Sequence, residues 1–159
     1  MFFCSPVQVL FHPDMDENSV LFLNWGVHFA AAVNFTNYKR LIDAFIKIIK
    51  HGDHDLSTGH TRQFKGYFIW KTTTALNRER FPNPHKDVRR FLTFPRVMLY
   101  NSYAIHAMCR AGIPVLDVYP VSDSYPDGTI SRDDPVHYSS HVFRSVEKFL
   151  YTMFSSNDK

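Results

Sequence analysis

Two short segments of this 159-residue sequence contain side chains that could act together chemically. In Asp134-Pro135-Val136-His137, a carboxylate and an imidazole stand three residues apart, just before a predicted helix. A carboxylate at this spacing can fix the tautomer of the imidazole, which leaves the second ring nitrogen free to act as a general base. The alternative is that Asp134 marks the start of the helix, because acidic residues stabilise helix N-termini.

The second segment, Asn24-Trp25-Gly26-Val27-His28-Phe29, directly follows a short apolar run. A glycine lets the backbone approach a ligand closely, and a glycine amide and an asparagine side chain are donor types that line oxyanion holes. Gly26 and Asn24 are therefore candidate pocket residues, and His28 could line the same pocket. The alternative is an ordinary turn in which His28 and Trp25 pack beside the strand end.

Hydrophobic periodicity predicts the scaffold that would position these segments. Apolar runs predict strands at residues 7–11, 19–24, 67–71 and 115–118, and a helical period predicts helices at 37–50, 87–111 and 139–154. We expect Thr36 or Asn37 to cap the first helix, Pro95 to bend or split the second, and Gly112 to end it. The last helix should turn these residues inward: Val142, Val146, Phe149, Leu150 and Met153.

Strands that alternate with helices predict an α/β fold with a mostly parallel sheet covered on both faces. In such sheets the chemistry lies just past the carboxyl ends of the strands. The expected site therefore combines the residues from Asn24 onward, those from Lys71 onward, and the loop that precedes the last helix.

Composition limits the classes of protein that fit. The length predicts one domain over 1–159, with 155–159 as a frayed tail, and 45% hydrophobic residues allow one core. A net charge of +3 without a basic stripe argues against a nucleic-acid partner. No apolar run is long enough to span a membrane. The two cysteines, Cys4 and Cys109, exclude a disulfide scaffold, and either one bridge or two thiols would fit.

Taken in order, the segments resemble the SGNH (GDSL-like) hydrolases, and more narrowly the PC-esterase and NXPE-like branch of acyl-esterases and O-acetyltransferases. The resemblance spans residues 19–154. It rests on the Asn24–Phe29 block, the strand followed by Lys71-Thr72-Thr73, the Asp134-x-x-His137 block and the closing amphipathic helix.

This resemblance implies a three-layer α/β/α, flavodoxin-like fold that is incomplete at its N-terminus, with no metal and no organic cofactor. Asp134 would be the acid and His137 the base of a catalytic triad, and Gly26, with Asn24 beside it, would help to hold the oxyanion. The implied substrate is a small acyl ester or a glycan. Such enzymes usually work in the secretory pathway, in the Golgi lumen or outside the cell, and the sequon at Asn34 agrees.

The sequence departs from the family pattern at the nucleophile. It contains no Gly-Asp-Ser motif, which the family places well upstream of the second block, and only 23 residues precede Asn24. Ser5 lacks the acidic and glycine neighbours of that motif. Lys71-Thr72-Thr73-Thr74 stands where the family has a third-block asparagine. We therefore expect either an incomplete acyl-esterase or a relative that binds its ligand without turnover.

Other groups allow weaker hypotheses. The histidines and aspartates of residues 51–60 could hold a metal or form a solvated loop, and His137 and His141 have ligand spacing without the glutamate of a zincin motif. Trp25 and Trp70 could stack on a sugar or pack in the core. A basic cluster could contact an acidic polymer or form a solvated face: Arg78, Arg80, Lys86, Arg89 and Arg90.

Overall fold

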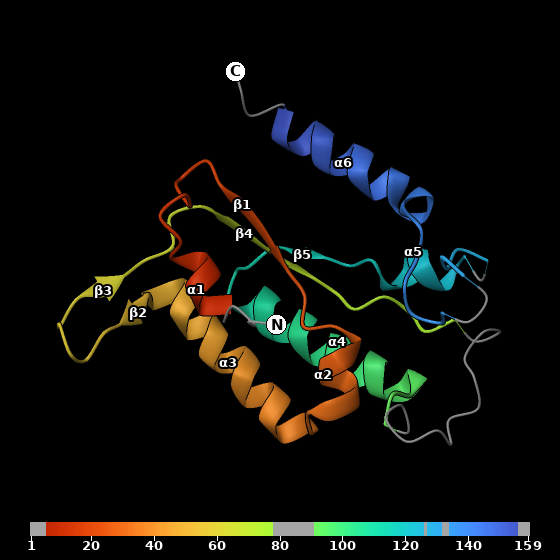
Figure 1. The fold of residues 1–159 in the computed structure, drawn as a ribbon, viewed down its shortest axis with the longest axis horizontal. Coiled ribbons are helices and arrows are strands. Elements are labelled where there is room, and N and C mark those ends of the chain that lie inside the picture. Colours follow the sequence, from red (N-terminus) through yellow and green to blue (C-terminus); the bar gives the residue numbers. More distant parts are fainter. Residues whose placement is uncertain (1–5, 78–90, 126, 132–133, 156–159) are drawn as a thin grey trace.

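A three-stranded parallel sheet forms the centre of the computed structural model, which describes residues 6–77, 91–125, 127–131 and 134–155 (Figure 1). Its strands are β1 (Val20–Leu23), β4 (Tyr67–Lys71) and β5 (Val115–Leu116), in the order β1-β4-β5. All four residues of β1 pair with β4, from Val20 opposite Tyr67 to Leu23 opposite Trp70. The parallel pairing of strands separated by helices confirms the predicted α/β class.

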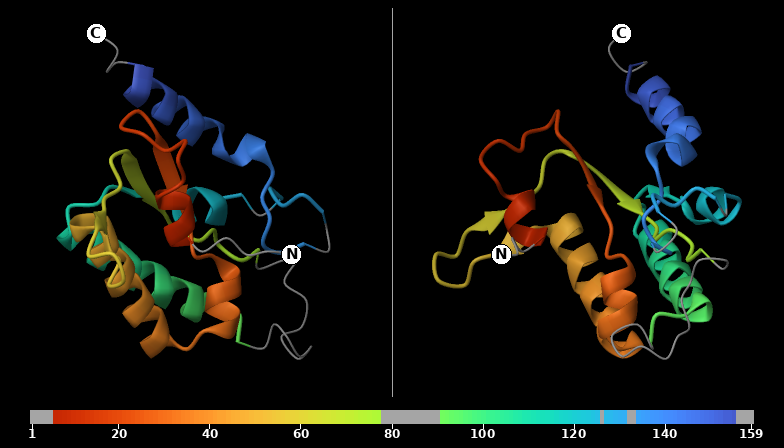
Figure 2. Two further views of the ribbon diagram at one scale, coloured as in Figure 1. Left: turned by 60° about the vertical axis from the view of Figure 1, so that its left-hand side comes forward. Right: turned by 45° about the vertical axis from the view of Figure 1, so that its right-hand side comes forward.

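Three helices cover one face of this sheet: α2 (Val27–Ala32), α3 (Phe35–His51) and α4 (Phe94–Arg110) (Figure 2). Alternate residues of β4 point into this layer, so Phe68 and Trp70 are buried against the helices. The helices contribute the rest of the core with their apolar stripes, which include Ala30, Tyr38, Ile42, Phe45, Val97, Tyr100, Ala104 and Met108. Burial of this aromatic-rich layer holds β1 and β4 against the helices. Because the two strands are parallel, they end at the same edge of the sheet.

On the opposite side of the sheet lies α6 (Arg144–Ser155), a third layer in which no residue is buried. A short helix, α5 (Tyr119–Asp123), and the 3-10 turn η2 (Ser140–Phe143) lead into this layer. The cover is loose, because an apolar cavity of about 250 Å³ lies between the sheet and α6. Phe149 is 61% exposed, so the prediction that it faces inward is wrong.

Three predicted segments differ from the structure. Residues 7–11 do not form a strand; they belong to α1 (Pro6–Leu10), which buries Leu10 in the core. A five-residue apolar run fits a buried helical turn as well as a strand, so periodicity alone could not decide. Residues 51–66, for which no helix or strand was predicted, contain the hairpin β2 (Asp53–His54) and β3 (Thr61–Arg62), and α5 lies in the segment after β5, where none was predicted either.

The helix ends give further corrections. The first predicted helix is confirmed as α3, but its cap is Asn34, whose side chain accepts a hydrogen bond from the Asn37 amide at 2.9 Å. The second begins at Phe94, so Pro95 lies in its first turn, where proline is tolerated, and introduces no bend. It ends at Arg110, and Gly112 follows with a φ of 70°, as expected of a stop signal.

Candidate active site

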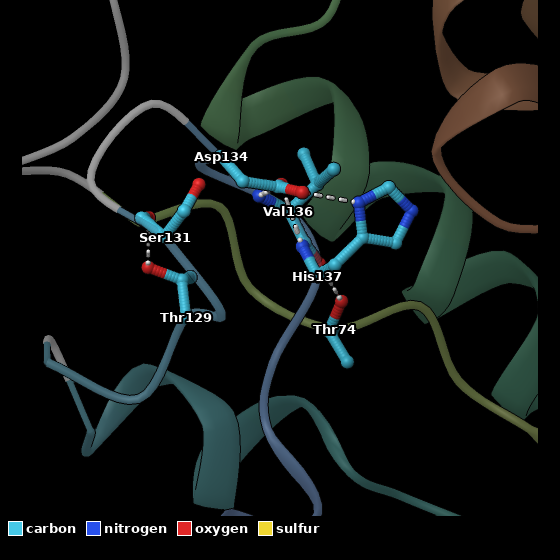
Figure 3. Close-up of polar contacts among 6 residues, drawn as sticks. All are labelled: Thr74, Thr129, Ser131, Asp134, Val136 and His137. Carbon is cyan, nitrogen blue, oxygen red and sulfur yellow. Dashed lines mark hydrogen bonds and ion pairs between the residues drawn. The ribbon is translucent and has the colours of Figure 1, made fainter.

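The structure pairs Asp134 with His137. Nδ1 of the imidazole lies 2.7 Å from Oδ2 of the carboxylate, and the second ring nitrogen points away from the pair (Figure 3). The His137 side chain is 64% exposed, whereas that of Asp134 is 22% exposed. The carboxylate therefore lies behind the imidazole and can orient it, while Nε2 remains open to a ligand.

The other carboxylate oxygen of Asp134 stabilises the loop itself. Oδ1 accepts hydrogen bonds from the amides of Val136 and His137, each at 3.0 Å. The following helical turn, η2, has Ser139 as its cap, so Asp134 does not serve as the start of a helix. Burial raises the pKa of Asp134, but the two amides and the imidazole more than offset this, and the pKa lies below its usual range.

This lowered pKa predicts how Asp134 affects stability. A carboxylate with a depressed pKa in the folded state stabilises the protein above its ordinary value of 3.8, and this contribution is lost as the pH falls through the folded-state pKa. The Asp134→Asn variant cannot titrate there. We expect the difference in unfolding free energy between wild type and variant, measured in urea, to shrink between pH 6 and roughly pH 3. A difference that is the same at both pH values would contradict this.

The segment that leaves β4 anchors the loop. The Thr74 hydroxyl donates to the carbonyl oxygen of Val136 at 3.3 Å, and the Asn77 amide donates to that of Pro135 at 2.8 Å. On the other side, the Ile130 amide donates to the carbonyl oxygen of His137 at 2.9 Å. The imidazole is therefore held at the carboxyl edge of the sheet from both sides.

A pocket of about 370 Å³ opens at this edge. The structure brings His137 together there with Asn24, Gly26 and His28, which lie more than 100 positions earlier in the chain. Asp134 stands behind His137. The complete set of described lining residues is Asn24, Gly26, Val27, His28, Lys71, Thr73, Thr74, Val136, His137 and Tyr138.

Asn24 ties the ends of two strands together. Its Nδ2 donates to the carbonyl oxygen of Lys71 at 2.8 Å and to Oγ1 of Thr73 at 3.3 Å, so both amide hydrogens have protein acceptors. Its Oδ1 faces Gly26, where an added Cβ would lie only 2.5 Å away. Asn24 and Gly26 are thus packed against each other, and no larger residue fits at position 26 unless Asn24 moves.

The Gly26→Ala variant tests this packing. We expect the new methyl group to displace Asn24 and break its bond to Lys71, with a loss of about 1 kcal/mol of stability. The chemical shifts of the Asn24 side-chain amide should change with it. The exposed Gly59→Ala variant is not a suitable control, because Gly59 has a positive φ. Ala32→Ser, at an exposed position of α2, serves instead. Unchanged stability with an unmoved Asn24 would contradict the packing argument.

Sequence reasoning missed Asn101, a buried residue of α4. Its Oδ1 accepts from the Thr73 amide at 2.9 Å, and its Nδ2 donates to the Thr73 carbonyl oxygen at 2.8 Å. The neighbouring Thr72 hydroxyl donates to Asp117 at 2.8 Å and accepts from the Val118 amide at 2.9 Å. The one available signal was a polar residue on the inward stripe of an amphipathic helix.

The alternative hypotheses find less support. Among the described residues, no group of three or more potential ligands is arranged to hold a metal ion. Asp53 pairs instead with Arg62 at 2.6 Å. Trp25 and Trp70 pack edge to face in the core with ring centroids 5.7 Å apart, which confirms the core interpretation.

Several predictions concern residues outside the described ranges: Ser5, Cys4 and the basic cluster of Arg78, Arg80, Lys86, Arg89 and Arg90. Cys109 is a free, exposed thiol on α4. In the described part of the chain, none of the helices combines the length and apolar character that crossing a bilayer requires.

No family model and no curated protein matches this sequence. Solved structures do match the fold. A carbohydrate acetylesterase from Sinorhizobium meliloti aligns with a TM-score of 0.55 at 11% identity, over 93% of this chain and 66% of that one. An alpha/beta hydrolase enzyme from the metagenome of Lake Arreo, Spain, aligns with a TM-score of 0.51 at 13% identity, over 88% of this chain and 61% of that one. This chain therefore has an α/β fold similar to theirs and spans less than two thirds of the length of either protein.

Proposed function

We propose that this chain forms the acid–base part of an acyl-ester hydrolase, an SGNH-like esterase or O-acetyltransferase acting on a glycan or another hydroxyl-bearing substrate. One observation carries the proposal: His137, oriented by Asp134 at 2.7 Å, stands at the wall of a pocket of about 370 Å³. A fold similar to that of a carbohydrate acetylesterase supports it.

The proposed mechanism follows from these positions. Nε2 of His137 accepts the proton of the attacking hydroxyl as its oxygen adds to the ester carbonyl, and Asp134 stabilises the imidazolium that results. The oxyanion accepts a hydrogen bond from the Gly26 amide, and Asn24 holds that segment in place. The imidazolium then returns the proton to the alcohol oxygen as the bond between that oxygen and the acyl carbon breaks, which leaves the acyl group on the attacking oxygen. In the second half of the reaction His137 takes a proton from water or from a sugar hydroxyl as that oxygen adds to the acyl carbon, and it returns the proton to the first attacking oxygen as this oxygen leaves.

The described lining residues include no serine and no cysteine that could supply the attacking group. Thr74 donates its hydroxyl hydrogen to Val136, and Thr73 accepts from Asn24. This observation favours a second candidate, a binding module that keeps the pocket but has no nucleophile. Without a serine, His137 has only water to activate, and turnover would be far slower than with an intact triad.

The test is the release of acetate from 4-nitrophenyl acetate and from acetylated oligosaccharides. The protein must first show cooperative unfolding by circular dichroism, so that inactivity is not a folding failure. Turnover above the buffer rate that requires His137 supports the esterase. Ligand binding without turnover, unaffected by His137→Ala, supports the binding module.

A further inference from the structure

Lys71 is the charged residue of the pocket that the proposed mechanism leaves unused. It is the last residue of β4, its side chain is half-buried, and it lines the same pocket as His137 and His28. Within residues 6–77, 91–125, 127–131 and 134–155, its ammonium group forms neither an ion pair nor a hydrogen bond.

The surroundings of Lys71 offer it no counter-charge. No aspartate or glutamate is among the described lining residues of the pocket, and Asp134 is already committed to His137 and two amides. On its other side, Lys71 lines the cavity beneath α6, whose other described walls are apolar: Phe22, Leu116, Val118, Phe143, Val146 and Leu150. Burial lowers the pKa of the Lys71 ammonium, which reflects the cost of holding a charge there.

A partly desolvated ammonium without a partner gains more from an incoming anion than an exposed one does, because less water must be displaced and the local dielectric is lower. The pocket also holds the Thr73 hydroxyl and the His28 imidazole, which can donate hydrogen bonds to an anionic oxygen. The wall of this pocket thus combines a lysine with neutral donors, and His137 lies in the same wall.

We infer that Lys71 binds an anionic group of the ligand, so that the substrate class is an ester of an acidic sugar bearing a carboxylate or sulfate near the scissile bond. This inference rests on the proposed function only in that the ligand is taken to be an ester. The anion site itself requires no turnover, so it can be tested independently.

The experiment is a titration of the ¹⁵N-labelled protein, followed by NMR, with three methyl glycosides of one ring geometry. These are methyl glucuronoside (a carboxylate), methyl glucoside 6-sulfate and the uncharged methyl glucoside. For wild type we expect both anions to bind at least about tenfold more tightly than the neutral glycoside, the range of one charge-assisted hydrogen bond. The shifts should be confined to amides around Asn24–His28 and Thr73. If one of the two anionic glycosides binds more tightly than the other, that difference shows whether the site prefers a carboxylate or a sulfate.

Three variants isolate the charge. Lys71→Met keeps a side chain of similar length without the charge. It should bind all three glycosides equally, with the affinity that wild type has for the uncharged methyl glucoside. Lys71→Arg should keep the preference for the anionic glycosides. Lys47→Met, at an exposed position of α3, is the matched control and should behave as wild type. Equal affinities in wild type, no binding of either anion up to the solubility limit, or a preference that survives in Lys71→Met would overturn the inference. Charge preference without acetate release would leave the anion site in place and remove the esterase proposal.

Discussion

Replacing His137 with alanine should lower the hydrolysis of 4-nitrophenyl acetate by about 10²–10⁴-fold, the contribution typical of a positioned general base. The reason is geometric: the imidazole reaches the pocket with one nitrogen held by Asp134 at 2.7 Å and the other free. The measurement is kcat/KM at pH 7.5 on protein of verified fold.

The control for this variant is His141→Ala, because His141 is an exposed histidine four residues away. It should keep activity within about twofold, as expected of a surface substitution outside the site. Equal rates for His137→Ala and wild type would mean that the observed hydrolysis arises elsewhere on the protein.

The Asp134→Asn variant tests whether the carboxylate acts through His137. The asparagine keeps an oxygen for the amides of Val136 and His137 but loses the charge and can hold the wrong imidazole tautomer. Because the two residues act together, the double variant should be little worse than His137→Ala alone. Losses that multiply in the double variant would show that the two side chains act independently.

Replacing Asn101 with leucine should lower the free energy of unfolding by about 2–4 kcal/mol. Asn101 is 6% exposed and satisfies both the amide and the carbonyl oxygen of Thr73. Leucine has a similar size but leaves two buried backbone groups without partners, each worth about 1–3 kcal/mol. Urea unfolding gives the free energy.

Ser102→Ala provides the comparison for this variant, since Ser102 is an exposed neighbour on the same helix. It should change stability by no more than about 0.5 kcal/mol. A loss below 1 kcal/mol in Asn101→Leu would mean that another group or water replaces the asparagine at Thr73.

The elements that carry the site were predictable because they are strongly patterned. The apolar runs at 20–23 and 67–71 form adjacent parallel strands, and the periodic segment at 37–50 lies within α3. The weakly patterned elements were not predictable. The apolar run at 7–11 forms a helical turn because Leu10 finds a core position there, and the hairpin β2–β3 has polar residues without alternation.

For the site, spacing predicted the local pair but not the distant contacts. Asp134 and His137 are three residues apart, so their contact depends on one loop, whereas the Asn101–Thr73 pairing joins residues 28 positions apart across two elements. The hydrogen-bond partner of a buried asparagine cannot be predicted until the position of its helix on the sheet is known. The same is true of Lys71, whose place between a polar pocket and an apolar cavity depends on where α6 packs.

We propose that His137, held by Asp134, acts as a base on an ester bound in this pocket. The most direct test follows acetate release from an acetylated oligosaccharide by ¹H NMR, with wild type and His137→Ala purified and checked for folding side by side. We expect steady release of acetate by wild type and release at the buffer rate by the variant. Folded wild type that releases acetate no faster than buffer, or a variant as fast as wild type, would contradict it.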